Sequence, residues 1–330
     1  MNLLNDIQAN YGFVINDMEQ LTGGWINQKY LIKTSINNLY VLKEISLKKF
    51  PSSYLKYLIK NVELQQYLYN QNILVPKVIL NKNENCVTKF SNDTYFFVQE
   101  YVDGYSKEFD QLNETEIYSI GQNLAKLHNK LKNVNSQPFK SSFLKLKNLN
   151  ILKQDLKTKQ SQINPSSSFK FIQELEKCKK ILIDIENNNI LDNNNQLQLI
   201  HGDFTPDNII FEDNNVKAIL DFELVRINSK LQDIGRIVLS TAFINFKFDS
   251  KKIQSFINGY SSISKIDYSD IINSLKFVWI NEFDIWIQDR YFKNYNPPKV
   301  EKFMNEIIWI GDNWFNLKEK IGGDKKYEKK

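Results

Sequence analysis

One segment constrains this chain of 330 residues more than any other, because it predicts both a local fold and a cluster of polar side chains. It begins with HGDFTPDNIIF at residues 201–211 and continues with VKAILDFE at residues 216–223. Two short apolar strands flank a polar turn, so Asn208 stands just before one strand and Asp221 just after the other. An antiparallel pair would bring both side chains to the same edge. With Asp203 five positions before Asn208, the segment offers the oxygen ligands that Mg²⁺ prefers, or an aspartate free to accept a proton.

The first hundred residues predict strands with one helix inserted. Residues 30–36 and 39–45 are rich in β-branched and aromatic side chains, and Asn37-Asn38 between them suits a tight hairpin turn. Side chains alternate along a strand, so Val41 and Lys43 share one face of the second run. Lys43 is therefore expected among apolar neighbours.

A helix is predicted over about residues 52–71. Leu55, Ile59, Val62 and Gln66 recur at helical spacing, Pro51 precedes them as a start signal, and Glu63 lies near the middle. Another strand covers residues 95–102 and ends at Asp103-Gly104. We take that dipeptide as the boundary between a first domain, residues 1–103, and a second domain, residues 104–330.

The second domain is predicted to be mainly helical. Apolar residues at three- and four-residue spacing over 120–131 indicate a helix that carries His128, which we interpret as structural rather than as a metal ligand. Residues 140–180 are rich in lysine, with a break at Asn164-Pro165, and this pattern is typical of a solvated face. We find no internal repeat.

Composition excludes several classes of protein. The 43 basic and 38 acidic side chains leave a net charge of only +5, and the two cysteines and two histidines cannot build a disulfide framework, a multi-cysteine zinc site or a histidine-rich metal site. The hydrophobic fraction of 42% supports a substantial core. No apolar run approaches a membrane span and the first residues lack a signal-peptide pattern, so we expect a cytoplasmic protein without a membrane partner.

The motif HGDFTPDN followed by ILDFE resembles the aminoglycoside phosphotransferase, homoserine kinase and choline kinase superfamily, the small-molecule relatives of protein kinases. The resemblance covers about residues 20–240. It implies an α+β, two-lobed, protein-kinase-like fold, with a small antiparallel-sheet N-lobe that binds nucleotide and a larger, mainly helical C-lobe for catalysis and acceptor binding. It also implies Mg²⁺ as cofactor and ATP or GTP as co-substrate.

The resemblance assigns roles residue by residue. Asp203 becomes the catalytic base, Asn208 and Asp221 the magnesium ligands, and Asp233 an aspartate that braces the catalytic loop. Lys43 becomes the lysine that pairs with nucleotide phosphates. The remaining nucleotide-binding candidates are Glu63 as the helix partner of Lys43, Val41 in the adenine pocket, Gly23 and Gly24 over the phosphates, and Gln99, Glu100, Tyr101 and Val102 as the hinge.

The acceptor is expected to be small. The sequence has Asp-Phe-Glu at 221–223 where a protein kinase has Asp-Phe-Gly, and no Ala-Pro-Glu element follows. Trp279, Glu282, Trp286 and Asp289 would fall on one helix face, where acids and indoles suit a cation. With the further acids Asp284 and Glu223, they favour an amine-bearing acceptor.

Several alternatives remain open. The residues around Gly24 to Tyr30 and the Val75-Pro76 connection resemble the homoserine kinase branch as much as the antibiotic-modifying branch. A nucleotide-binding pseudokinase would keep the fold without turnover. A basic nucleic-acid-binding protein is opposed by the small charge excess, so no nucleic-acid partner is expected.

Overall fold

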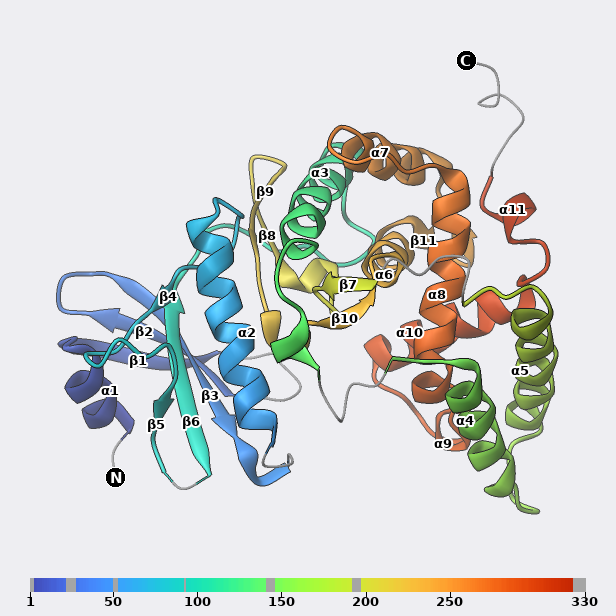
Figure 1. The fold of residues 1–330 in the computed structure, drawn as a ribbon, viewed down its shortest axis with the longest axis horizontal. Helices are drawn as coiled ribbons and strands as arrows, with labels where there is room; N and C mark the ends of the chain where they lie inside the picture. Colours follow the sequence, from blue (N-terminus) through green and yellow to red (C-terminus); the bar gives the residue numbers. More distant parts are fainter. Residues whose placement is uncertain are drawn as a thin grey trace. The chain divides into compact units, whose positions relative to one another are not determined.

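The structure, a computed structural model, describes residues 3–21, 28–49, 53–91, 93–140, 146–191 and 197–322. The chain forms two compact units (Figure 1). Unit 1 contains Met1–Ser106, Asn135–Ser141 and Asn208–Val225, and unit 2 contains Lys107–Val134, Ser142–Asp207 and Arg226–Lys330. The first boundary falls at Ser106, close to the expected one, but a later piece of the chain returns to unit 1.

Unit 1 is built on an antiparallel sheet of six strands in the order β1-β2-β3-β6-β4, with β5 also paired to β6. The strands are β1 (Ile15–Leu21), β2 (Gln28–Thr34), β3 (Leu39–Ser46), β4 (Val78–Ile79), β5 (Thr88–Lys89) and β6 (Thr94–Glu100). The predicted hairpin between β2 and β3 is confirmed, but its connection spans the four residues 35–38 instead of Asn37-Asn38 alone. Asn37 within it has a positive φ of 61°. Asparagine tolerates this left-handed conformation better than most residues.

Two helices cover the opposite faces of this sheet. Helix α1 (Leu3–Tyr11) contributes Ile7 to a buried cluster with Leu42 of β3 and with Phe96 and Val98 of β6. Side chains alternate, so Lys43 and Gln99 face the other way. There Gln65 of helix α2 (Ser53–Asn70) donates to the Gln99 side chain at 3.0 Å, which puts α2 on the Lys43 face.

A separate hairpin completes unit 1. Strands β8 (Ile209–Glu212) and β9 (Asn215–Ile219) pair antiparallel, and Glu212 lies opposite Asn215, which leaves a two-residue turn. Asp213 and Asn214 in that turn both have positive φ, 46° and 63°, as a tight hairpin turn requires. The strands and turn that the sequence predicts here are confirmed.

Unit 2 is mainly helical. Its helices are α3 (Glu114–Leu131), α4 (Leu149–Ser161), α5 (Phe169–Asn187), α6 (Leu231–Ala242), α7 (Ser250–Ser261), α8 (Tyr268–Trp286), α9 (Asp289–Lys293), α10 (Pro298–Asp312) and α11 (Leu317–Lys320). Its strands form two short pairs, β7 (Leu197–Ile200) with β10 (Arg226–Ser229) and β11 (Phe243–Ile244) with β12 (Lys247–Phe248). The predicted mixture of an antiparallel sheet and a helical part is confirmed.

Helix α6 lies at the centre of unit 2, because every residue from Leu231 to Ala242 is buried. It packs on α8 with Gly235 against the backbone of Ser274, where an added Cβ would lie 2.3 Å from the carbonyl oxygen. Helices α3 and α7 approach as closely at Gly259. These contacts hold the start of α6, and with it Asp233, in a fixed place within unit 2.

Two further expectations can be compared with the structure. Both cysteines, Cys86 and Cys178, are buried and free, which fits a chain whose two cysteines build no disulfide framework. Among the helices of the described residues, none has the length and apolar composition needed to cross a membrane.

Candidate active site

The β8–β9 hairpin carries the two predicted metal ligands to one of its ends. Asn208 directly precedes β8, and its carbonyl accepts from the amide of Leu220 at 2.8 Å. Asp221 is the next residue after Leu220, and its backbone is left-handed, with φ of 67°. A non-glycine residue in this conformation is uncommon and often marks a functional position.

A cluster of two lysines and two carboxylates surrounds Asp221 within unit 1. The ammonium of Lys43 donates to Asp221 at 3.0 Å and to Glu223 at 3.1 Å, and Lys29 of β2 donates to the other oxygen of Asp221 at 3.2 Å. Lys29 and Lys43 are direct partners in the β2–β3 register. The side chain of Lys43 is only 3% exposed, so this charge depends on its carboxylate partners.

The electrostatics of the cluster follow from burial and charge. Burial acts to lower the pKa of Lys43, but Asp221 and Glu223 outweigh it and raise that pKa above its usual range. Burial acts to raise the pKa of Asp221, and the charges of Lys43 and Lys29 overcome it, so that this pKa lies below its usual range. Burial raises the pKa of Glu223 despite the opposing effect of Lys43. The cluster therefore combines ammonium groups with an ionised aspartate.

Unit 2 holds the loop that carries Asp203. The loop follows β7, and the amides of His201 and Gly202 donate to the two carboxylate oxygens of Asp233 at 2.8 and 2.9 Å. Arg226 also donates to the carbonyl of Gly202 at 3.0 Å. The prediction that Asp233 braces this loop is confirmed by these contacts.

His128 supports the same aspartate, as expected for a structural histidine. Its Nε2 lies 3.1 Å from Asp233 Oδ2, and its Nδ1 lies 2.9 Å from the hydroxyl of Tyr260. Burial lowers the pKa of His128, while Asp233 opposes that effect. The neutral ring with a proton on Nε2 satisfies both contacts, because Tyr260 then donates to Nδ1.

The predicted hinge residues continue from β6. Gln99 pairs with Val41 across the β3–β6 ladder, while the amides of Glu100 and Tyr101 donate to the carbonyls of Lys77 and Leu39. The amide of Val102 donates to no backbone carbonyl within the part of the chain that the structure describes. Gly23 and Gly24 lie outside the described residues.

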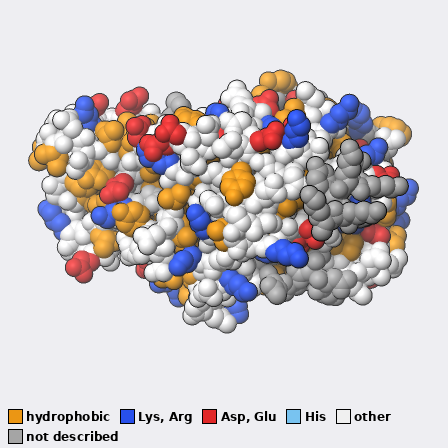
Figure 2. Space-filling view, turned by 90° about the horizontal axis from the view of Figure 1, so that it is seen from above, with side chains coloured by type: hydrophobic (Ala, Val, Ile, Leu, Met, Phe, Trp, Pro, Cys, Tyr) orange, Lys and Arg blue, Asp and Glu red, His pale blue; other side chains and the backbone are white. Residues whose placement is uncertain are grey.

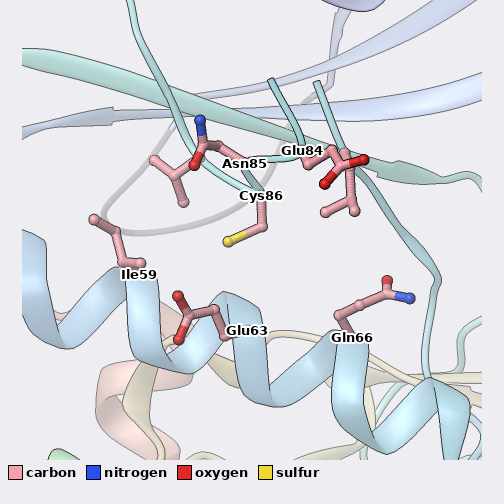
Figure 3. A pocket seen from close by; sticks show the side chains of 8 residues that line it. Ile59, Glu63, Gln66, Glu84, Asn85 and Cys86 are labelled. Atoms are coloured by element: carbon pink, nitrogen blue, oxygen red, sulfur yellow. The ribbon is translucent and has the colours of Figure 1, made fainter. Parts of the chain in front are cut away.

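The predicted pairing of Glu63 with Lys43 is wrong. The Glu63 side chain is 46% exposed and contacts Lys60 at 2.5 Å. It points into a cavity of about 230 Å³ that Cys86 also lines (Figure 3). Residues two positions apart differ by about 200° around a helix, and Asn61 faces Glu223, so Glu63 must face away.

The acids predicted to bind an amine-bearing acceptor are already paired within the chain. Glu223 is buried against Lys43, and Glu282 accepts from Arg236, from Gln232 and from the indole of Trp286. Asp284 accepts from Lys147 at 2.8 Å, and Asp289 pairs with Lys293 at 2.5 Å. These carboxylates therefore act as internal partners, and the prediction that they bind a cationic acceptor is not supported.

The predicted common face of Trp279, Glu282, Trp286 and Asp289 is also wrong. Helix α8 ends at Trp286, and Asp289 begins α9. The buried amine of Lys159 donates to the carbonyls of Asp284 and Ile287 at 2.7 and 2.8 Å. Terminal carbonyls of a helix need such partners, so Lys159 ends the helix from another part of the chain.

Sequence reasoning missed Lys29. The expected two-residue turn at 37–38 would have placed Lys29 opposite Ser46, whereas the connection spans residues 35–38 and pairs Lys29 with Lys43 on the same face. Arg226 was missed as well. No spacing rule links it to Gly202, since the contact depends on the pairing of β7 with β10.

Known proteins resemble this chain in family and in fold. A family model described as "Phosphotransferase enzyme family" matches residues 17–268. A comparison with curated protein sequences gave no match. Similarity to solved structures is extensive in fold but low in sequence identity.

Three solved structures illustrate that similarity. The amicoumacin kinase hAmiN in complex with AMP-PNP, Ca²⁺ and Ami has a TM-score of 0.67 at 14% identity, covering 94% of this chain and 92% of that chain. Spectinomycin phosphotransferase APH(9)-Ia in complex with ADP and spectinomycin has a TM-score of 0.64 at 14% identity, covering 94% and 96%. The GDP complex of wild-type aminoglycoside 2′-phosphotransferase-IIIa has a TM-score of 0.67 at 16% identity, covering 96% and 100%. The predicted kinase-like fold is confirmed.

Proposed function

Because this chain belongs to the phosphotransferase enzyme family, we propose that it transfers the γ-phosphate of Mg·ATP or Mg·GTP to a hydroxyl group of a small molecule. The observation that carries this proposal is the buried ammonium of Lys43, held 3.0 Å from Asp221 at the end of the β8–β9 hairpin. Phosphoryl transfer depends on positioned positive charge and on a positioned hydroxyl more than on covalent chemistry.

The nucleotide would be bound by unit 1. Lys43 would contact its phosphates, and Lys29, which shares the Asp221 partner and is 23% exposed, would add a second cation. Val41 and the backbone of residues 99–102 would contact the base. Among these hinge residues, Val102 offers the amide that no other backbone group in the described residues occupies.

Asn208 and Asp221 would hold Mg²⁺. Both stand at one end of the hairpin, and Mg²⁺ would have to replace at least one of the two ammonium groups that now contact Asp221. Among the described residues no group of three or more His, Cys, Asp and Glu could hold a metal ion by itself, so phosphate oxygens and waters would complete the coordination. Bound Mg²⁺ would neutralise negative charge on the phosphates.

Asp203 would orient the acceptor hydroxyl and accept its proton. This role is supported by the rigid loop that carries it, because Asp233 and Arg226 fix the backbone of the two preceding residues. A base held in place in this way lowers the entropic cost of aligning the hydroxyl with the phosphate. The lysine cluster then stabilises charge on the transferred group.

The proposed acceptor is a small molecule with a free hydroxyl group. Solved structures with this fold include an amicoumacin kinase and a spectinomycin phosphotransferase with spectinomycin bound, so antibiotics of these kinds are the first acceptors to test. Homoserine, choline and hydroxylated amino acids are the alternatives that the sequence leaves open. A nucleic-acid partner finds no support in the charge balance of 43 basic and 38 acidic side chains, and both kinds are scattered over the one face that Figure 2 shows.

The test is nucleotide-dependent transfer. Release of ADP from Mg·ATP and of GDP from Mg·GTP would be followed with a panel of aminoglycosides, spectinomycin, homoserine, choline and hydroxylated amino acids. The Asp203→Asn chain serves as the matched blank, because it keeps the shape of the side chain and removes the proton acceptor. We expect acceptor-dependent release from the wild-type chain, and none from the variant although it still binds Mg·nucleotide.

Two results would contradict the proposal. Normal turnover by Asp203→Asn would remove the assignment of the base. Nucleotide binding without turnover for every acceptor would favour a pseudokinase instead.

A further inference from the structure

The helix next to Lys43 offers no carboxylate that can hold it. Glu63 is the only acidic residue of α2, and it faces away from Lys43 towards Lys60. Lys43 nevertheless carries a charge that is almost fully buried. Its position must therefore be fixed by carboxylates from another part of the chain.

Glu223 meets this requirement. It is itself buried, at 8% exposure, and one of its carboxylate oxygens lies 3.1 Å from the ammonium of Lys43. It follows Asp221 by two positions, in the short helical turn Phe222–Leu224.

Helix α2 acts on this turn through hydrogen bonds to the backbone. The side chain of Asn61 donates to the carbonyl of Glu223 at 2.9 Å, and the hydroxyl of Tyr57 donates to the carbonyl of Val225 at 2.6 Å. All four donor and acceptor groups are buried. The helix thus fixes the turn that presents the Glu223 carboxylate.

Asp221 cannot provide the same support during the reaction. It is shared between Lys43 and Lys29, and it is the proposed magnesium ligand. A carboxylate that binds a metal ion has less capacity to hold a lysine. Glu223 is buried against Lys43, so it can keep its contact with the ammonium group while Asp221 binds the metal ion.

We propose that Glu223 is the positioning residue that orients Lys43 toward the nucleotide phosphates, in the place of the helix carboxylate that the sequence predicted. This inference rests on the proposed function, since it assumes that Lys43 contacts phosphates. It assigns the third residue of Asp-Phe-Glu to nucleotide binding rather than to the acceptor.

The experiment measures binding of the full-length chain to Mg·AMP-PNP and Mg·GMP-PNP, and to adenosine and guanosine, which lack phosphates. The variants are Glu223→Gln, Lys43→Ala and the double variant, with Glu63→Gln as the matched control on α2. Because a hydrogen bond to a charged group changes an equilibrium constant by on the order of 10- to 100-fold, we expect Glu223→Gln to weaken triphosphate binding by about that factor. The affinity of Glu223→Gln for the nucleosides should stay within about twofold of wild type. The affinity of Glu63→Gln for the triphosphate analogues should also stay within about twofold.

The double variant separates positioning from general damage to the fold. If Glu223 acts through Lys43, Glu223→Gln adds no further loss once Lys43 is alanine. Thermal unfolding of each variant checks the fold. If Glu223→Gln does not fold, Glu223→Asp carries the test, because it keeps the charge but withdraws it by one methylene, and it should also weaken triphosphate binding.

Three results would overturn the inference. The first is wild-type triphosphate affinity in the folded Glu223 variants. The second is an equal loss of nucleoside and triphosphate binding in those variants. The third is a double variant whose loss of triphosphate affinity is the product of the losses in Glu223→Gln and Lys43→Ala. A wild-type chain that binds neither analogue would instead overturn the proposed function and this inference together, so the two failures are distinguishable.

Discussion

Replacing Asp233 by alanine should damage unit 2 and the catalytic loop together. The buried carboxylate accepts from two backbone amides of the loop, at 2.8 and 2.9 Å, and contacts His128 at 3.1 Å. Alanine would leave both amides without an acceptor. A buried donor without a partner costs about 1–3 kcal/mol, so the two amides and the lost histidine contact predict about 4 kcal/mol in the free energy of unfolding.

The assay is thermal unfolding. For a folded unit of 150–250 residues, about 4 kcal/mol corresponds to a decrease in Tm of roughly 8–16 °C. Asp249→Ala is the matched control, because Asp249 also accepts from two backbone amides, those of Lys251 and Lys252, but is half-buried at the start of α7. Loss of such a cap costs about 1 kcal/mol.

A milder substitution at position 233 and the Asp249→Ala control both test the role of these hydrogen bonds. Asp233→Asn keeps one acceptor oxygen and should lose about half as much stability as Asp233→Ala. Phosphoryl transfer by the asparagine variant should fall by on the order of 100-fold, because the loop that carries Asp203 loses its fixed position. If Asp233→Ala unfolds at the same temperature as Asp249→Ala, the hydrogen-bond network does not stabilise the unit as argued.

Three further predictions concern other parts of unit 2. Gly259→Ala would place a Cβ 2.0 Å from the carbonyl oxygen of Tyr118. We therefore expect denaturant unfolding to show a decrease of about 3 kcal/mol in the free energy of unfolding. An unchanged denaturation midpoint would contradict the close approach of α3 and α7. Burial lowers the pKa of His128 from 6.5, so the unfolded chain binds a proton first as the pH falls, and stability should decrease below about pH 6.5 by up to about 1.4 kcal/mol per pH unit. His128→Asn should make the dependence of Tm on pH shallower, and an unchanged dependence would exclude this origin. Lys159→Met removes the donor to two carbonyls at the end of α8. Chemical denaturation should show a decrease of about 2 kcal/mol in the free energy of unfolding. Wild-type stability of this variant would mean that Lys159 is not needed to end the helix.

Local patterns in the sequence predicted the elements that carry the site. The hairpin around Asn37, the helix that contains Glu63 and the strand pair between Asn208 and Asp221 all lie where spacing and turn residues indicated. Each depends on residues close together in the chain. The pairing of β8 with β9 followed from its turn, but the register of β2 with β3 did not, because that connection is longer than the dipeptide Asn37-Asn38.

Contacts between distant segments were not predictable in this way. The partner of Lys43 was assigned to α2 from a stripe through Leu55, Ile59 and Gln66, but the buried face runs through Leu58, Asn61 and Gln65, and its polar members give no apolar signal. The end of α8 was missed because no glycine or proline marks it, and Lys159 stops the helix from another helix of the chain. A carboxylate in a sequence likewise gives no sign of whether an internal cation already occupies it, as Lys147 occupies Asp284.

Unit 1 includes residues Asn208–Val225, which are synthesised long after its sheet, and this affects how the unit can fold during translation. Lys43 and its carboxylate partner Glu223 are 180 residues apart. At a synthesis rate of about 5–20 residues per second, the ribosome needs roughly 10–35 s to reach the partner after it has made the lysine. During that time the ammonium group has no Glu223 carboxylate to pair with and stays hydrated. The first sheet therefore cannot close over Lys43 until two thirds of the chain has been translated.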